Sequence, residues 1–178
     1  MKNLTIRILS LLSDNGVKIY SSVIRMGING SKVDNASSGG ITCGIKKDGH
    51  LNSYAYSAAG EKYDIHPTSK IKFDDITIPN FQKAKELVTN LHPTIPMFRL
   101  VSWDIAIDEE GEPILIEANL KYGELDFHQL NNGPVFGEDT EKILFTASKN
   151  LLNESEIPLP SKSLKISANS PNVPKSAS

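Results

Sequence analysis

Two carboxylates and an amide lie on two apolar segments that flank a glycine-containing turn. The turn is centred on Glu110 and Gly111. With two residues in that turn, Asp104 lies directly opposite Glu117 in an antiparallel pair. Asn119 shares the face of Glu117, because side chains alternate along a strand. The spacing therefore predicts three oxygen-bearing side chains on one face of a β-hairpin.

Carboxylates that face each other across a strand pair repel unless a cation lies between them. Oxygen ligands of this kind suit Mg²⁺ or Mn²⁺, and Mg²⁺ fills its other positions with water and phosphate oxygens. We therefore expect Asp104, Glu117 and Asn119 to be metal ligands. Ala106 and Leu115 form an apolar patch on the same face, which could contact a nucleobase. The alternative is an open sheet face on which both acids are solvated.

The elements around this hairpin predict an α+β fold, an antiparallel sheet with helices packed on it. Apolar runs predict strands over 4–12, 17–25, 41–46, 51–57, 100–108 and 113–120. Helical spacing predicts one helix that Pro79 opens and a second over 139–153. The residues expected to face the core are Trp103, Ile105, Ile107, Ile114, Ile116 and Ala118 from the hairpin and Ile143, Leu144, Ala147 and Leu151 from the second helix.

Composition narrows the class of protein. The 178 residues fit one domain, and a net charge of −2 argues against a nucleic-acid partner. No segment approaches the roughly 20 apolar residues of a membrane span. The single cysteine, Cys43, is expected as a buried strand residue in a reducing, cytoplasmic protein. We expect a folded body over 1–156 and a disordered Ser/Pro/Lys tail over 157–178.

Six blocks, in order along the chain, resemble the ATP-grasp superfamily, and most closely its sugar-transfer-associated branch. They are LTIRI at 4–8, IRMG at 24–27, VDNASSGGI at 33–41, WDIAI at 103–107, LIEANL at 115–120 and DFHQLNNG at 126–133. The ordered set is fairly specific, whereas an Asp…Glu-x-Asn triplet alone is weak. The resemblance covers about residues 4 to 151 and implies the fold of the C-terminal ATP-grasp lobe.

The resemblance also implies roles for particular residues. The positions of Asp104, Glu117 and Asn119 hold one or two Mg²⁺ on the ATP phosphates in the family. Arg7 and Arg25 match arginines near the phosphates or the carboxylate substrate, where a planar guanidinium fits either group. The residues matching a loop at the mouth of the active site are Asn35, Gly39 and Gly40. Without the resemblance, these glycines would indicate a plain turn, and each arginine a surface ion pair.

Two further side chains could take part in the chemistry. His128 lies with Asp126 and Gln129 in a block typical of this branch, which we expect to be a loop. Its imidazole could act as a base near neutral pH, and a structural hydrogen-bonding histidine is the alternative. Lys121 follows the predicted metal strand and could reach a phosphate; a solvated lysine is the alternative.

The resemblance implies phosphoryl transfer from ATP to a carboxylate, followed by attack of an amine on the acyl phosphate. The substrate is expected to be a small-molecule or sugar-linked carboxylate in polysaccharide or surface glycan biosynthesis. In the family, an N-terminal lobe supplies a phosphate-contacting lysine and the adenine hinge, so we expect it as a separate partner. The alternatives are a non-catalytic half-domain that binds a partner chain or a glycan precursor, and an inactive fragment.

Overall fold

The computed structural model describes residues 5–28, 39–121 and 123–155, with side chains up to 149. The chain forms two compact units that divide after Gly137. The first contains the sheet and two of the helices, and the second contains the last helix. None of the helices in the described ranges has the length and apolar character to cross a bilayer.

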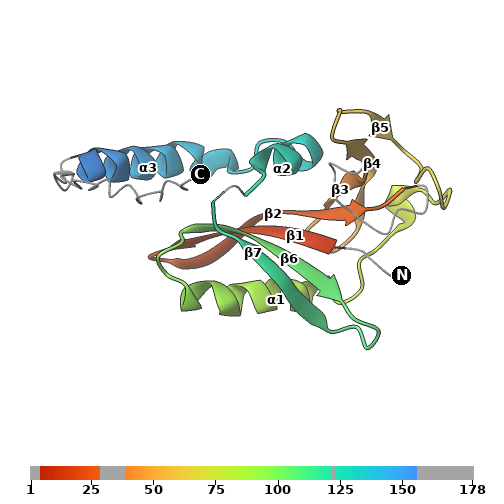
Figure 1. The fold of residues 1–178 in the computed structure, drawn as a ribbon, viewed down its shortest axis with the longest axis horizontal. Helices are drawn as coiled ribbons and strands as arrows, with labels where there is room; N and C mark the ends of the chain where they lie inside the picture. Colours follow the sequence, from red (N-terminus) through yellow and green to blue (C-terminus); the bar gives the residue numbers. More distant parts are fainter. Residues whose placement is uncertain (1–4, 29–38, 122, 156–178) are drawn as a thin grey trace, which may run out of the picture. The chain divides into compact units, whose positions relative to one another are not determined.

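The first unit is built on a seven-stranded antiparallel sheet in the order β5-β4-β3-β2-β1-β6-β7 (Figure 1). The strands are β1 Thr5–Ser13, β2 Gly16–Met26, β3 Ile41–Ile45, β4 Leu51–Ser57, β5 Lys62–Tyr63, β6 Leu100–Ile107 and β7 Pro113–Asn119. Six of them confirm predicted strands, and the two-residue β5 was not predicted. Because β1 lies between β2 and β6, segments almost 100 residues apart become neighbours.

Two helices lie on opposite faces of this sheet (Figure 1). Helix α1, Phe81–Leu91, buries Phe81, Ala84 and Val88. It begins two residues after Pro79. Helix α2, Leu125–Asn132, contacts β2, β3 and β4 on the other face. The short 3-10 helices are η2 Phe73–Asp75, η3 His92–Thr94 and η4 Gly137–Asp139.

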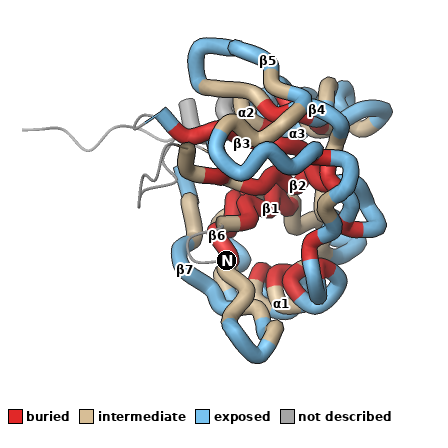
Figure 2. Tube along the Cα trace, turned by 90° about the vertical axis from the view of Figure 1, so that its right-hand side faces the viewer, coloured by how far each residue is buried: buried red, intermediate tan, exposed pale blue. Residues whose placement is uncertain are grey.

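The hydrophobic core lies between the sheet and α1. Ile6 and Ile8 of β1 are buried there beside Trp103 and Ile105 of β6. Figure 2 shows the buried positions following β1, β2 and β6 and the inner side of α1. The prediction that Trp103 packs in the core is confirmed, and so is the burial of Cys43 in a strand. The opposite face of the same strands is polar and carries the predicted site.

Helix α3, Thr140–Ser155, belongs to the second unit. Leu144 is 63% exposed, and Ala147 is also exposed, so the prediction that they face the core is wrong. Ile143 is half-buried. Helical spacing reveals an apolar stripe but does not reveal what covers it. The side chain of Leu151 and the predicted tail, 157–178, lie outside the described residues.

Candidate active site

The β6–β7 hairpin places Asp104 directly opposite Glu117, as predicted. The loop, however, holds three residues rather than two. Asp108 N–H donates to Glu112 O at 2.9 Å, Gly111 N–H donates to Asp108 O at 3.2 Å, and Gly111 has φ 85°. The longer loop alone would shift every pair by one residue. A bulge at Ile116 adds the residue that restores the Asp104–Glu117 pair.

The bulge changes which side chains share a face with Asp104. Between the bulge and the turn, Leu115 lies opposite Ile105 and Ile114 lies opposite Ala106. The predicted faces of Ile114 and Leu115 are therefore wrong, and Ala106 and Leu115 do not form one patch. Ile114, Leu115 and Ile116 are all exposed on this edge strand, so Ile114 and Ile116 do not face the core. Leu115 as a nucleobase contact stays a prediction.

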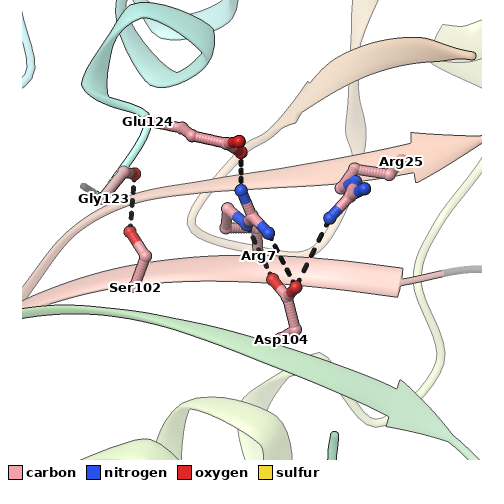
Figure 3. Close-up of polar contacts among 6 residues, drawn as sticks. All are labelled: Arg7, Arg25, Ser102, Asp104, Gly123 and Glu124. Carbon is pink, nitrogen blue, oxygen red and sulfur yellow. Dashed lines mark hydrogen bonds and ion pairs between the residues drawn. The ribbon is translucent and has the colours of Figure 1, made fainter. Parts of the chain in front are cut away.

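Arg7 and Asp104 form the centre of the polar face. They lie opposite each other on β1 and β6, and each is 4% exposed. Arg7 Nε donates to Asp104 Oδ1 and Nη2 donates to Oδ2, both at 2.7 Å (Figure 3). Arg25, from β2, adds a contact from Nη1 to Asp104 Oδ2 at 3.3 Å. Two guanidinium groups thus converge on one buried carboxylate, which meets the requirement that buried charges be paired.

A second carboxylate completes the ion network. Glu124 Oε2 pairs with Nη1 of Arg7, the guanidinium nitrogen that Asp104 leaves available (Figure 3). Glu124 directly precedes α2 and has φ 48°, a left-handed conformation that costs a residue with a side chain about 1–2 kcal/mol. Ser102 Oγ also donates to Gly123 O at 2.8 Å. Gly123 and Glu124 are therefore attached to the sheet at two points.

His128 lies on α2, and the prediction of a loop there is wrong. Its side chain is fully buried, and Nδ1 is 2.8 Å from Ser21 Oγ on β2. Burial and, to a smaller extent, the nearby charge of Arg7 lower the pKa of His128 from 6.5 to about 4, with Asp104 partly opposing the shift. The imidazole is therefore neutral at pH 7. Its Nε2 atom has no hydrogen-bond partner within the described ranges.

Asparagine side chains hold α2 against the sheet. Asn131 Nδ2 donates to Thr42 Oγ1 at 2.7 Å, and Asn132 Nδ2 donates to Ser21 Oγ at 2.8 Å. Gly44 of β3 allows this approach, because a Cβ there would lie 2.0 Å from Asn132 Oδ1. These contacts fix His128 over the polar face.

The structure brings some predicted site residues together and leaves others apart. Arg7, Arg25, Asp104 and His128 gather in one cluster. Lys121 is exposed, two residues after the end of β7. Gly39 and Gly40 precede β3, with Gly39 exposed and Gly40 buried, whereas Asn35 lies outside the described residues. Their functional roles stay predictions.

The remaining two predicted metal ligands lie on β7. Glu117 is exposed opposite Asp104, and Asn119 lies opposite Ser102 on the same face. The Nδ2 atom of Asn119 is buried and has no hydrogen-bond partner in the part of the chain that is described. Glu124 was not predicted as part of the site. The sequence gives no sign that an acid after β7 belongs to the site, because only the left-handed backbone of Glu124 turns it toward Arg7.

One of the three predicted metal ligands, Asp104, is engaged by two arginines in this arrangement. Both oxygens of Asp104 already accept hydrogen bonds from Arg7, and Oδ2 also contacts Arg25. A cation at Asp104 would face two positive groups. Among the described residues, no cluster of three His, Cys, Asp or Glu side chains could hold a metal ion. Metal ligation by Asp104, Glu117 and Asn119 stays a prediction.

Comparison with known proteins identifies one family. A family model described as sugar-transfer associated ATP-grasp matches residues 3–144, which include β1–β7 and the arginine–carboxylate cluster. No curated protein and no solved structure matches the chain significantly.

Proposed function

Because the chain belongs to the sugar-transfer associated ATP-grasp family, we propose that it carries the phosphate-binding part of an ATP-dependent carboxylate–amine ligase. The proposed substrate is a small-molecule or sugar-linked carboxylate used in polysaccharide or surface glycan biosynthesis. The observation that carries the proposal is the convergence of Arg7 and Arg25 on buried Asp104. An anion at this face would meet two guanidinium groups that are already held in position.

The proposed reaction has two steps. A substrate carboxylate oxygen attacks the γ-phosphorus of ATP, the bond to ADP breaks, and an acyl phosphate forms. An amine then attacks the acyl carbon, and inorganic phosphate leaves as the amide forms. Such transfers depend on positioning and on neutralising charge at the phosphoryl oxygens. Arg7 and Arg25 would supply positive charge, and Asp104 would hold Arg7 in place.

The cofactors and the partner are also proposals. ATP with Mg²⁺ or Mn²⁺ follows from the family, with Glu117 and Asn119 offering oxygen ligands beside the arginine–carboxylate cluster. We further propose that an N-terminal ATP-grasp lobe supplies the adenine-binding side. Neutral His128 adds no charge at pH 7, so Arg7 and Arg25 are the positive groups of the cluster around Asp104.

A second candidate function is a non-catalytic half-domain that binds a partner chain. The exposed apolar edge strand favours it, since Ile114 is 47% exposed and Ile116 is 60% exposed on β7. An edge strand with free backbone groups and apolar side chains is suited to pairing with another chain.

Calorimetric titration of the full chain with ADP, with and without Mg²⁺, tests the first proposal. We expect the wild-type chain to bind ADP. In Arg25→Gln the affinity for ADP should fall at least about tenfold, because charge-assisted contacts to phosphate are strong. Arg99→Gln is the matched control, since Arg99 pairs with Asp14 and Leu12 O elsewhere. Equal affinity of Arg25→Gln and wild type would contradict the role of Arg25. No ADP binding would favour the half-domain.

A further inference from the structure

We propose that Glu124 is an internal substitute for the ligand anion. Its carboxylate occupies the place on Arg7 that an oxyanion of the ligand, a phosphate or a carboxylate, takes when it binds. The inference rests on the proposed function and adds to it a competition between the ligand and the protein's own side chain.

The donors of Arg7 divide between two unlike carboxylates. Nε and Nη2 bind Asp104, whose side chain is 6% exposed, whereas Nη1 pairs with Glu124, whose side chain is 45% exposed. Asp104 is held inside the sheet between paired strands. Glu124 lies on the connection before α2 and can rotate into solvent at smaller cost. Of the two carboxylates, Glu124 is therefore the one that an incoming anion replaces.

Charge balance agrees with this exchange. Arg7 and Arg25 both pair with Asp104, and Arg7 also pairs with Glu124, so Glu124 adds a second negative charge beside the two guanidinium groups. His128 is buried above the same cluster without a charge. Removing Glu124 from Arg7 leaves Nη1 without its acceptor while Nε and Nη2 stay on Asp104, and a ligand oxyanion can take the vacated donor.

Unsatisfied polar atoms lie beside this cluster. Asn119 Nδ2 and His128 Nε2 are buried, and neither has a hydrogen-bond partner within the described ranges. Asn119 lies opposite Ser102, the residue that binds Gly123 next to Glu124. Buried polar groups are normally hydrogen-bonded, so the Asn119 Nδ2 donor points to a ligand with acceptor oxygens, and His128 Nε2 offers a second polar contact. Oxyanions also match the planar donors of arginine.

The test uses the full chain and two probes, inorganic phosphate and acetate, in separate titrations. Each titration is followed by NMR of the arginine Nε–H groups. The sequence contains three arginines, so the spectrum contains three signals, and one of them reports on Arg7. We expect Glu124→Gln to bind a probe about three- to fivefold more tightly than wild type, the range of a partly exposed ion pair. If Glu124→Gln binds phosphate but not acetate more tightly than wild type, the natural ligand group is a phosphoryl group. If it binds acetate but not phosphate more tightly, the group is a substrate carboxylate.

Asp126→Asn is the matched control. It removes the same charge two residues away, and Asp126 is exposed and forms no ion pair among the described residues. Its affinity is expected to equal that of wild type. Glu124→Asp keeps the charge on a shorter side chain. Its affinity for the probe is expected to lie between that of wild type and that of Glu124→Gln.

Three results would overturn the inference. One is equal probe affinity of wild type and Glu124→Gln, with or without loss of stability, which would make the Arg7–Glu124 pair purely structural. Another is equal tightening in Asp126→Asn, which would indicate a general charge effect. The third is no binding of either probe by any variant. In each case ADP binding, measured separately, still decides whether the proposed function stands.

Discussion

Arg7 and Asp104 form a two-point contact across β1 and β6, with both hydrogen bonds at 2.7 Å and both residues almost completely buried. The pair links a strand near the start of the chain to one 97 residues later. It also determines where the planar guanidinium group lies, and so which of its donors remains for other groups. The pair is therefore both a structural contact and the base of the candidate site.

Asp104→Asn is expected to lower the free energy of unfolding by about 3 kcal/mol, because it leaves the buried Arg7 charge without its main partner. Urea denaturation measures the change. Glu117→Gln is the control, since Glu117 faces Asp104 from β7 but is exposed, and its effect should stay within about 0.5 kcal/mol. Equal effects of the two variants would argue against the pair as the main electrostatic contact.

The stability of the folded protein should fall as the pH is lowered from 6.5 to 4. The folded state holds the pKa of His128 at about 4, below its ordinary value of 6.5. Between pH 6.5 and 4 the unfolded chain binds more protons than the folded protein does. The free energy of unfolding therefore falls, by at most about 3 kcal/mol. Urea denaturation across this range should show a weaker pH dependence in His128→Gln. The same slope in both proteins would contradict the lowered pKa.

Gly44→Ala should loosen α2, because an added Cβ would meet Asn132 Oδ1, Asn52 Nδ2 and the backbone oxygen of Asn131. We expect the free energy of unfolding to fall by about 1–3 kcal/mol and amide hydrogen exchange in α2 to become faster. Gly60→Ala is the control: Gly60 has φ 82° and open space around it, so strain there stays local. Unchanged exchange in α2 of Gly44→Ala would contradict the close approach of helix and strand.

The thiol of Cys43 should be unreactive in the folded protein at pH 8. It is fully buried on β3, and burial raises its pKa to about 12. A thiol-reactive disulfide reagent should modify it only after unfolding in urea. Ser53→Cys, at an exposed position on β4, supplies a reactive thiol for comparison. Modification of Cys43 at the rate of that exposed thiol would contradict its burial.

Local sequence patterns predicted much of the fold. The predicted strands over 4–12 and 17–25 form the hairpin of β1 and β2, joined by a turn at Asp14 and Asn15, because turn residues and two apolar runs specify a hairpin without help from distant residues. The strand pattern also predicted the burial of Trp103. Helix α2 was missed, since one eight-residue helix has little periodicity and begins after a left-handed glutamate.

In the candidate site, the loop length and the bulge of the β6–β7 hairpin could not be predicted from the local sequence. The Asp104–Glu117 pairing was correct although the loop was one residue longer than expected, because the bulge at Ile116 compensates for it. Neither feature has a clear signal in the sequence. The same bulge reversed the expected faces of Ile114 and Leu115, since one inserted residue exchanges the two faces of a strand.

By itself, the sequence determined the strand-forming segments, the side chains available for chemistry and the family, because turn residues, alternation and ordered motifs are local properties of the chain. Only the tertiary structure decided their partners. It placed β1 between β2 and β6, which brought Arg7 and Arg25 onto Asp104, and it turned Glu124 toward Arg7. Strand order and a left-handed residue depend on the packing of the whole sheet, and no local pattern specifies them.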